Sequence, residues 1–246
     1  MIPAAANVAT VTRLSANLLI PNLLASFDLS CNSLLCPIEC HTLTTVETKE
    51  MFQNEMLPTT LEELHQRMEG HTPLRVNEAG VAEAAVSVLL SPNGSGDLEL
   101  LLLKRAERRD DPWSGQISLP GGRRDTEDED LLATAIRETR EETGVVVTRD
   151  ALVGELDDVY PRSELLPSVF ARPFVFFHPL RARPTLGPEA DLALWVTTSE
   201  LRASERRDTV NAGGTLRTVT GYRIGPHFLW GLTERVLTPL LDLMGA

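Results

Sequence analysis

A glycine pair followed by a short helix constrains the fold of this chain more than any other stretch of its sequence. Residues 117–119 are typical of a short buried strand, and Gly121 and Gly122 form a turn directly after it. The pattern then predicts a helix over residues 130–142, with apolar residues on one face and Gly144 just beyond its end. This part of the chain therefore predicts a strand, a tight turn and an amphipathic helix in succession.

The other expected elements extend this unit to a layered domain. Apolar runs bounded by turn residues predict further strands over residues 81–90, 98–104, 151–160, 168–177 and 192–197. Apolar residues at helical spacing predict a closing helix over residues 229–244. Strands mixed with two substantial helices are typical of a mixed sheet that is covered by helices. We therefore expect an α/β fold with a mixed β-sheet.

The first part of the chain has a different composition. Residues 1–55 show no apolar periodicity and few charges, so we expect a poorly ordered N-terminal extension that the folded domain does not require. Residues 56–78 predict a short helix, with Leu64 and Met68 on its apolar stripe, and then a linker. The strands and both longer helices fall in residues 79–246, which we expect to form the functional domain.

All three cysteines lie in the N-terminal extension, at Cys31, Cys36 and Cys40, and His41 follows them. These residue types can bind zinc, but their spacing lacks the paired C-x2-C pattern of zinc sites, so we interpret them as free thiols. The rest of the chain has no cysteine and therefore no disulfide framework. A reducing, cytoplasmic location is the resulting expectation.

The charge of the chain limits its partners. The sequence has 23 basic and 35 acidic residues, a formal net charge of −12, whereas nucleic-acid binding needs a basic surface. No apolar stretch approaches the roughly 20 residues of a membrane-spanning helix. We therefore expect neither a nucleic acid nor a membrane as partner. A small phosphorylated substrate is compatible with the composition if a metal ion or local arginines offset the repulsion. The sequence does not determine the oligomeric state, and a homodimer is compatible with it.

Three glutamates on the predicted helix point to metal chemistry. Glu138, Glu141 and Glu142 stand at positions i, i+3 and i+4, so their side chains converge on one face. Like charges at these spacings repel by roughly 0.2–0.5 kcal/mol per pair in an exposed helix. Carboxylate oxygens are the ligands that Mg²⁺ prefers, so a bound cation would relieve this repulsion. The alternative is a solvated charged face on which Arg137 and Arg140 pair with the glutamates.

The residues around these glutamates resemble a known family motif. Residues 121–145 read GGRRDTEDEDLLATAIRETREETGV and are similar to the Nudix box, G-x5-E-x7-R-E-U-x-E-E-x-G-U, in which U is apolar. The matching residues are Glu129, Arg137, Glu138, Glu141, Glu142, Gly144 and Val145. Two positions depart from the pattern, because Thr139 replaces an apolar residue and the glycine stands one residue early, at Gly122.

This resemblance implies a fold, a reaction and a set of site residues. It implies an α/β/α sandwich for the Nudix domain and hydrolysis of a diphosphate bond with Mg²⁺, or Mn²⁺ in its place. The implied metal ligands are Glu138, Glu141, Glu142 and the carbonyl group of Gly122. The implied catalytic residues are Glu138 and Glu141, one of the glutamates handling the attacking water, and Arg137, which would orient the carboxylates.

Three further segments resemble the Nudix enzymes that act on coenzyme A. Residues 102–106 and 115–122 read LLKRA and GQISLPGG, and residues 228–233 read FLWGLT. This resemblance implies a pyrophosphatase that cleaves coenzyme A or an acyl-CoA to 3′,5′-ADP and a 4′-phosphopantetheine product. Departures at residues 104–106 and at Leu119 leave a broader hydrolase of ADP-ribose, NADH or dinucleoside polyphosphates as the alternative. A catalytically silent nucleotide sensor is a further alternative, although its usual mark is a missing box glutamate.

Arginines near the box are candidate phosphate ligands. We expect Arg105, Arg109 and Arg123 to bind the substrate, although pairing with nearby acidic residues is an equally good interpretation. Trp113 or Tyr222 could stack on an adenine ring, but packing is the commoner role of such residues.

Overall fold

The computed structural model describes residues 61–109, 113–161, 168–212 and 214–245. The expected extension over residues 1–55, with its cysteines, lies outside the described residues. The short helix expected within residues 56–78 is α2 (Leu61–Gly70), and it buries Leu64 and Met68 of the predicted stripe.

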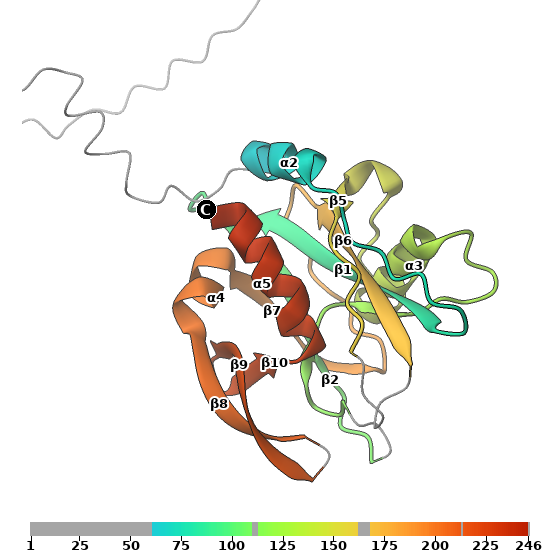
Figure 1. The fold of residues 1–246 in the computed structure, drawn as a ribbon. Helices are drawn as coiled ribbons and strands as arrows, with labels where there is room; N and C mark the ends of the chain where they lie inside the picture. The colour runs from blue at the N-terminus through green and yellow to red at the C-terminus, as the bar shows by residue number, and fades with distance from the viewer. Residues whose placement is uncertain (1–60, 110–112, 162–167, 213, 246) are drawn as a thin grey trace, which may run out of the picture. The chain divides into compact units, whose positions relative to one another are not determined.

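A seven-stranded mixed sheet carries the domain (Figure 1). Its strands are β1 (Ala82–Pro92), β2 (Leu98–Arg105), β3 (Ile117–Ser118), β4 (Gly121–Arg123), β5 (Leu152–Glu155), β6 (Val169–Phe177) and β7 (Ala190–Thr197). Strand β1 pairs in parallel with β6 and antiparallel with β2 and β4, and β7 pairs with β2. The expected α/β fold with a mixed sheet is confirmed.

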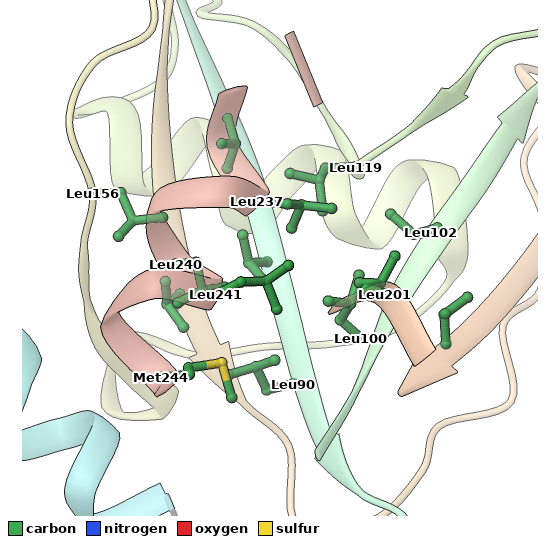
Figure 2. Close-up of a cluster of buried hydrophobic side chains, with 14 of the residues drawn as sticks. Leu90, Leu100, Leu102, Leu119, Leu156, Leu201, Leu237, Leu240, Leu241 and Met244 are labelled. Atoms are coloured by element: carbon green, nitrogen blue, oxygen red, sulfur yellow. The ribbon is translucent and has the colours of Figure 1, made fainter. Parts of the chain in front are cut away.

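Helices cover both faces of this sheet. Successive side chains of a strand point to opposite faces. On one face, Val88 of β1 lies in an apolar cluster with residues of α2 and of α5 (Leu232–Gly245). Figure 2 shows leucines of α5 in this cluster. On the other face, its neighbour Leu89 lies in a second cluster with α3 (Leu131–Thr143). The described residues therefore form an α/β/α sandwich.

The segment after β7 differs from the prediction. It forms α4 (Thr198–Ser204) and then a three-stranded antiparallel sheet of β8 (Glu205–Ala212), β9 (Thr215–Ile224) and β10 (His227–Trp230). The sequence pattern missed these strands because β8 and the first half of β9 are largely polar and exposed, so no apolar alternation marks them. The predicted closing helix begins at residue 232, not 229, because residues 229 and 230 pair with β9.

The strand predicted over residues 151–160 is shorter in the structure. Strand β5 ends at Glu155, and Val159 forms only an isolated bridge with Ala171. Pro173 of β6 lies opposite this stretch and has no N–H group to extend the ladder, although its carbonyl oxygen accepts from the Leu156 N–H at 3.1 Å.

A buried carboxylate, instead, organises the chain beyond β5. The side chain of Asp158 is fully buried. It accepts hydrogen bonds from Arg172 Nε at 2.8 Å, from Arg75 Nη1 at 3.2 Å and from the Val76 N–H at 2.9 Å. These contacts join the linker after α2 to β6.

The threonine that departs from the Nudix pattern has a matching partner on β1. Thr139 is fully buried, and its hydroxyl oxygen lies 2.7 Å from Ser87 Oγ and 2.7 Å from the Ala135 carbonyl oxygen. Ser87 is also fully buried, and its hydroxyl donates to the same carbonyl at 3.2 Å. The two buried hydroxyls are hydrogen-bond partners. This pairing accommodates a threonine at position 139, where the Nudix pattern has an apolar residue.

We expect the two hydroxyls to be coupled in stability. Thr139→Val keeps the shape of the side chain but removes a partner of Ser87, and it should lower the free energy of unfolding by about 1–2 kcal/mol. The double variant Ser87→Ala with Thr139→Val leaves no buried hydroxyl unsatisfied and should lose less than the sum of the two single variants. Chemical denaturation of the four proteins measures this coupling. Strictly additive losses would contradict it.

Candidate active site

Helix α3 has clear signals at both ends. The carboxylate of Asp130 precedes the helix and accepts a hydrogen bond from the Ala133 N–H at 2.7 Å. Gly144 ends the helix with a left-handed φ of 68°, and its N–H donates to the Arg140 carbonyl. These caps explain why the helix agrees with its predicted range to within one residue at each end.

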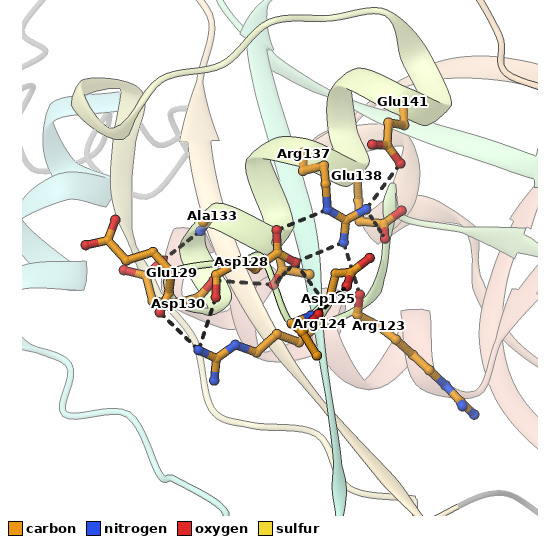
Figure 3. Close-up of polar contacts among 12 residues, drawn as sticks. Arg123, Arg124, Asp125, Asp128, Glu129, Asp130, Ala133, Arg137, Glu138 and Glu141 are labelled. Atoms are coloured by element: carbon orange, nitrogen blue, oxygen red, sulfur yellow. Dashed lines mark hydrogen bonds and ion pairs between the residues drawn. The ribbon is translucent and has the colours of Figure 1, made fainter.

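Arg137 connects two of the box glutamates (Figure 3). Its Nη1 donates to Glu138 Oε1 at 2.8 Å and to Glu141 Oε2 at 3.1 Å. Its Nε and Nη2 donate to the two carboxylate oxygens of Asp128 at 3.1 and 3.0 Å, and Nη2 also donates to the Arg123 carbonyl oxygen at 3.1 Å. The guanidinium group therefore sets the orientation of three carboxylates at once.

Asp128 is an acidic partner of Arg137 that the alignment with the Nudix box does not include. Its carboxylate is buried, and the hydrogen bond from Arg137 lowers its pKa to about 2 against the opposing effect of burial. Glu129, which was aligned with the box, is instead exposed and pairs with Arg149 at 3.2 Å. An alignment that starts from Gly122 places Asp128 at the acidic position of the box, because five residues separate the two, as in the G-x5-E part of the pattern.

The third box glutamate, Glu142, has a different hydrogen-bond partner from the other two. Its side chain is 8% exposed, and Oε2 accepts a hydrogen bond from the Gly121 N–H at 2.9 Å. Burial raises the pKa of Glu142 to about 7, although the Gly121 N–H and the positive charge of Arg105 act in the opposite direction. Burial also raises the pKa of Glu138, against the effect of Arg137. A nearby cation would favour the ionised form of both carboxyl groups.

The two glycines allow a close approach at this site. A Cβ atom on Gly122 would lie 2.5 Å from Glu138 Oε1. A Cβ atom on Gly121 would meet the Ala85 carbonyl oxygen and lie 2.7 Å from Val86 Cα, and Gly121 has a φ of 153°. Glycine is therefore needed at the first position for β4 to pair with β1, and at the second for the Glu138 carboxylate to lie against the turn.

The donors suit a hard cation but do not form a complete cage. Within the described ranges, no group of three or more His, Cys, Asp or Glu side chains converges on one point. Glu138 and Glu141 face Arg137, whereas Glu142 faces the Gly121 N–H. Mg²⁺ usually binds through one or two carboxylates together with substrate phosphates and water, and carboxylates crowded against a glycine turn fit that mode.

The candidate phosphate ligands are placed differently. Arg105 is half-buried at the end of β2, and its charge acts on Glu142. Arg109 and Arg123 are exposed, and Figure 3 shows the Arg123 side chain pointing away from Arg137. Tyr222 is buried and its hydroxyl lies 2.7 Å from Thr238 Oγ1, so it packs in the core, which is the commoner of the two roles considered for it.

The last segment of the coenzyme A resemblance, residues 228–233, has a structural role. Gly231 adopts a left-handed φ of 78° between β10 and α5. Just after it, the buried hydroxyl of Thr233 donates to the Ile117 carbonyl oxygen at 3.3 Å. This contact ties the start of α5 to β3, the strand that leads into the glycine turn.

A comparison with known families agrees with this geometry. The model of the NUDIX domain matches residues 81–216, and the chain belongs to the Nudix family. Among its relatives, mitochondrial coenzyme A diphosphatase NUDT8 of Homo sapiens is 33% identical over 167 residues, which cover 66% of this chain and 70% of that protein. Peroxisomal coenzyme A diphosphatase ndx-8 of Caenorhabditis elegans is 35% identical over 141 residues, which cover 53% and 55%.

A crystal structure of a MutT/nudix family protein from Enterococcus faecalis aligns with a TM-score of 0.49 and 19% identity, over 81% of this chain and 75% of that one. In the part of the chain that the structure describes, no helix is long and apolar enough to cross a membrane.

Proposed function

We propose that this protein is a metal-dependent diphosphate hydrolase that cleaves coenzyme A or an acyl-CoA to 3′,5′-ADP and a 4′-phosphopantetheine product. The observation that carries the proposal is the set of Glu138, Glu141 and Glu142 on α3, beside Arg137 and the glycine turn. Diphosphate cleavage requires that negative oxygens be neutralised and that a water molecule be activated, and carboxylates that hold a metal ion can support both.

Each residue has a distinct part in this proposal. Glu138, Glu141, Glu142 and the Gly122 carbonyl would hold Mg²⁺ or Mn²⁺, which supplies charge neutralisation and a more acidic bound water. Arg137 keeps Glu138 and Glu141 oriented through its paired hydrogen bonds. One glutamate accepts the proton of the attacking water.

The choice of coenzyme A rests on two supports. The relatives NUDT8 and ndx-8 are named coenzyme A diphosphatases, and the segments at residues 115–122 and 228–233 resemble that group. The departures at residues 104–106 favour a second candidate, a broader hydrolase of nucleoside diphosphates such as ADP-ribose. A cytoplasmic location stays a prediction, since these relatives are named mitochondrial and peroxisomal.

The two candidates differ at the 3′-phosphate of adenosine. We expect kcat/KM for coenzyme A to exceed that for dephospho-CoA by about tenfold or more, because a charge-assisted contact contributes about 1.5–3 kcal/mol. Arg105→Gln or Arg109→Gln should reduce this preference, whereas Arg206→Gln on the exposed strand β8 is the matched control. Kinetics under Mg²⁺ with coenzyme A, dephospho-CoA and ADP-ribose measure it. A preference for ADP-ribose would overturn the coenzyme A assignment and leave the hydrolase class standing.

A further inference from the structure

The C-terminal turn of α3, which carries Glu141 and Glu142, is held by a segment far away in the sequence. We call residues 185–189 the strap. The Thr185 N–H donates to the Thr143 carbonyl oxygen at 2.7 Å, and the Gly187 N–H donates to the Glu142 carbonyl oxygen at 3.0 Å. The last carbonyl groups of a helix have no partner within the helix. The strap therefore satisfies groups of this turn that would otherwise need water.

The contact is a close approach between two backbones. A Cβ atom on Gly187 would lie 2.6 Å from the Glu141 carbonyl oxygen and 3.5 Å from Glu142 Cα. Nearby, a Cβ atom on Gly144 would lie 3.2 Å from Thr185 Cβ. The obstacle at Gly187 is backbone, which cannot rotate away as a side chain can. A side chain at position 187 would therefore have to displace either the strap or the helical turn.

The other side of the strap contacts the residues that follow β2. The Ala106 N–H donates to the Glu189 carbonyl oxygen at 2.8 Å. Arg108 Nη2 donates to the Pro188 carbonyl oxygen at 3.1 Å, and Arg108 Nη1 lies 3.5 Å from the Glu189 carboxylate. Arg105, a candidate phosphate ligand, immediately precedes this stretch. The strap thus contacts both the turn of α3 that carries Glu141 and Glu142 and the residues that follow Arg105.

We propose that Gly187 and Arg108 are positioning residues that set the placement of the α3 carboxylates relative to residues 105–109. This inference rests on the proposed function. In that function the α3 carboxylates are the metal ligands, and residues 105–109 include the substrate ligands. Gly187 acts through the backbone of Glu141 and Glu142. Arg108 acts through the strap carbonyl of Pro188 and the carboxylate of Glu189. Errors of about 1 Å in such groups can cost on the order of 100-fold in rate.

The first test is Gly187→Ala. We expect its dissociation constant for Mn²⁺, measured by electron paramagnetic resonance without substrate, to rise by about 10-fold, and kcat to fall by about 10- to 100-fold. KM should change less than kcat, because the clash at position 187 is with the α3 backbone that carries the glutamates. Gly94→Ala is the matched control, since its Cβ atom would meet nothing within 4 Å, and it should behave as the wild type. Thermal melts show whether each variant is folded.

The second test is Arg108→Gln, which removes the ion pair with Glu189 and weakens the side-chain contact with the strap without introducing a clash. We expect KM to rise several-fold while Mn²⁺ binding stays at the wild-type value. If Gly187→Ala does not fold, the Arg108→Gln variant tests the inference alone. A wild-type KM in Arg108→Gln then overturns the inference. A folded Gly187→Ala protein with wild-type Mn²⁺ affinity and kcat overturns it as well. A wild-type protein that neither binds Mn²⁺ nor cleaves a diphosphate would overturn the proposed function together with this inference.

Discussion

Replacing Glu142 with glutamine should lower kcat by about 10²- to 10⁴-fold while the fold is retained. Glutamine has nearly the same size, and its carbonyl oxygen can still accept the hydrogen bond from the Gly121 N–H, but it has no negative charge to offer a cation. Steady-state kinetics under Mg²⁺ measure the loss. Glu127→Gln, an exposed glutamate in the turn before α3, is the control and should keep wild-type turnover.

The same variant tests the electrostatic origin of the site. The pKa of Glu142 is raised from 4.5 to about 7 by burial. Below pH 4.5 the group is neutral in both the folded and the unfolded protein. Between about pH 4.5 and 7 the unfolded state ionises first, so the metal-free protein loses stability as the pH rises, by about 3 kcal/mol at most. Glu142→Gln lacks this titration.

Denaturation in a chelator at pH 5 and pH 8 measures the effect. The stability of Glu142→Gln relative to the wild type should increase between these two values. A difference that does not change with pH would mean that burial does not raise the pKa of Glu142, and the electrostatic account of the site would be wrong.

The second large effect is a difference between alanine substitutions at Gly121 and at Gly122, one lowering stability and the other lowering kcat. Gly122→Ala places a Cβ atom 2.5 Å from Glu138 Oε1, the far end of a flexible side chain, so the carboxylate moves and the fold remains. We expect kcat to fall by about 10- to 100-fold with little change in melting temperature. Gly121→Ala instead meets the backbone of β1 at a φ of 153°, and its free energy of unfolding should fall by about 3 kcal/mol or more.

Thermal melts and kinetics of the two variants distinguish the roles. Wild-type kcat in Gly122→Ala would show that the position of Glu138 does not matter. A Gly121→Ala protein as stable as the wild type would show that β4 does not need to lie so close to β1.

Helix α3 could be predicted because its signals are local. Asp130 and Gly144 cap the helix, and the apolar face and the glutamates repeat at helical spacing. Figure 3 shows Glu138 and Glu141 of this helix beside Arg137. The longer strands of the main sheet were found for a similar reason, since their buried side chains form continuous apolar runs, whereas Gly121 and Gly122, predicted as a turn, belong to the short strand β4.

Other features depend on contacts that no local pattern records. Asp128 was missed because the additional residue of this box lies between it and Arg137, which shifts the alignment onto Glu129. Strands β8 and β9 were missed because β8 and the first half of β9 are largely polar and exposed. The contact of Gly187 with Glu142 joins residues that are distant in sequence, and only the folded chain reveals why a glycine stands there.

The central claim is that the carboxylates of α3 support metal-dependent cleavage of a diphosphate bond. Phosphorus NMR of coenzyme A incubated with the full-length protein tests this claim directly. We predict that the diphosphate resonances disappear in Mg²⁺ and are replaced by those of 3′,5′-ADP and 4′-phosphopantetheine. We also predict that they persist in a chelator and with the Glu142→Gln variant. Cleavage that continues without a divalent cation, or at the wild-type rate in Glu142→Gln, would contradict the account.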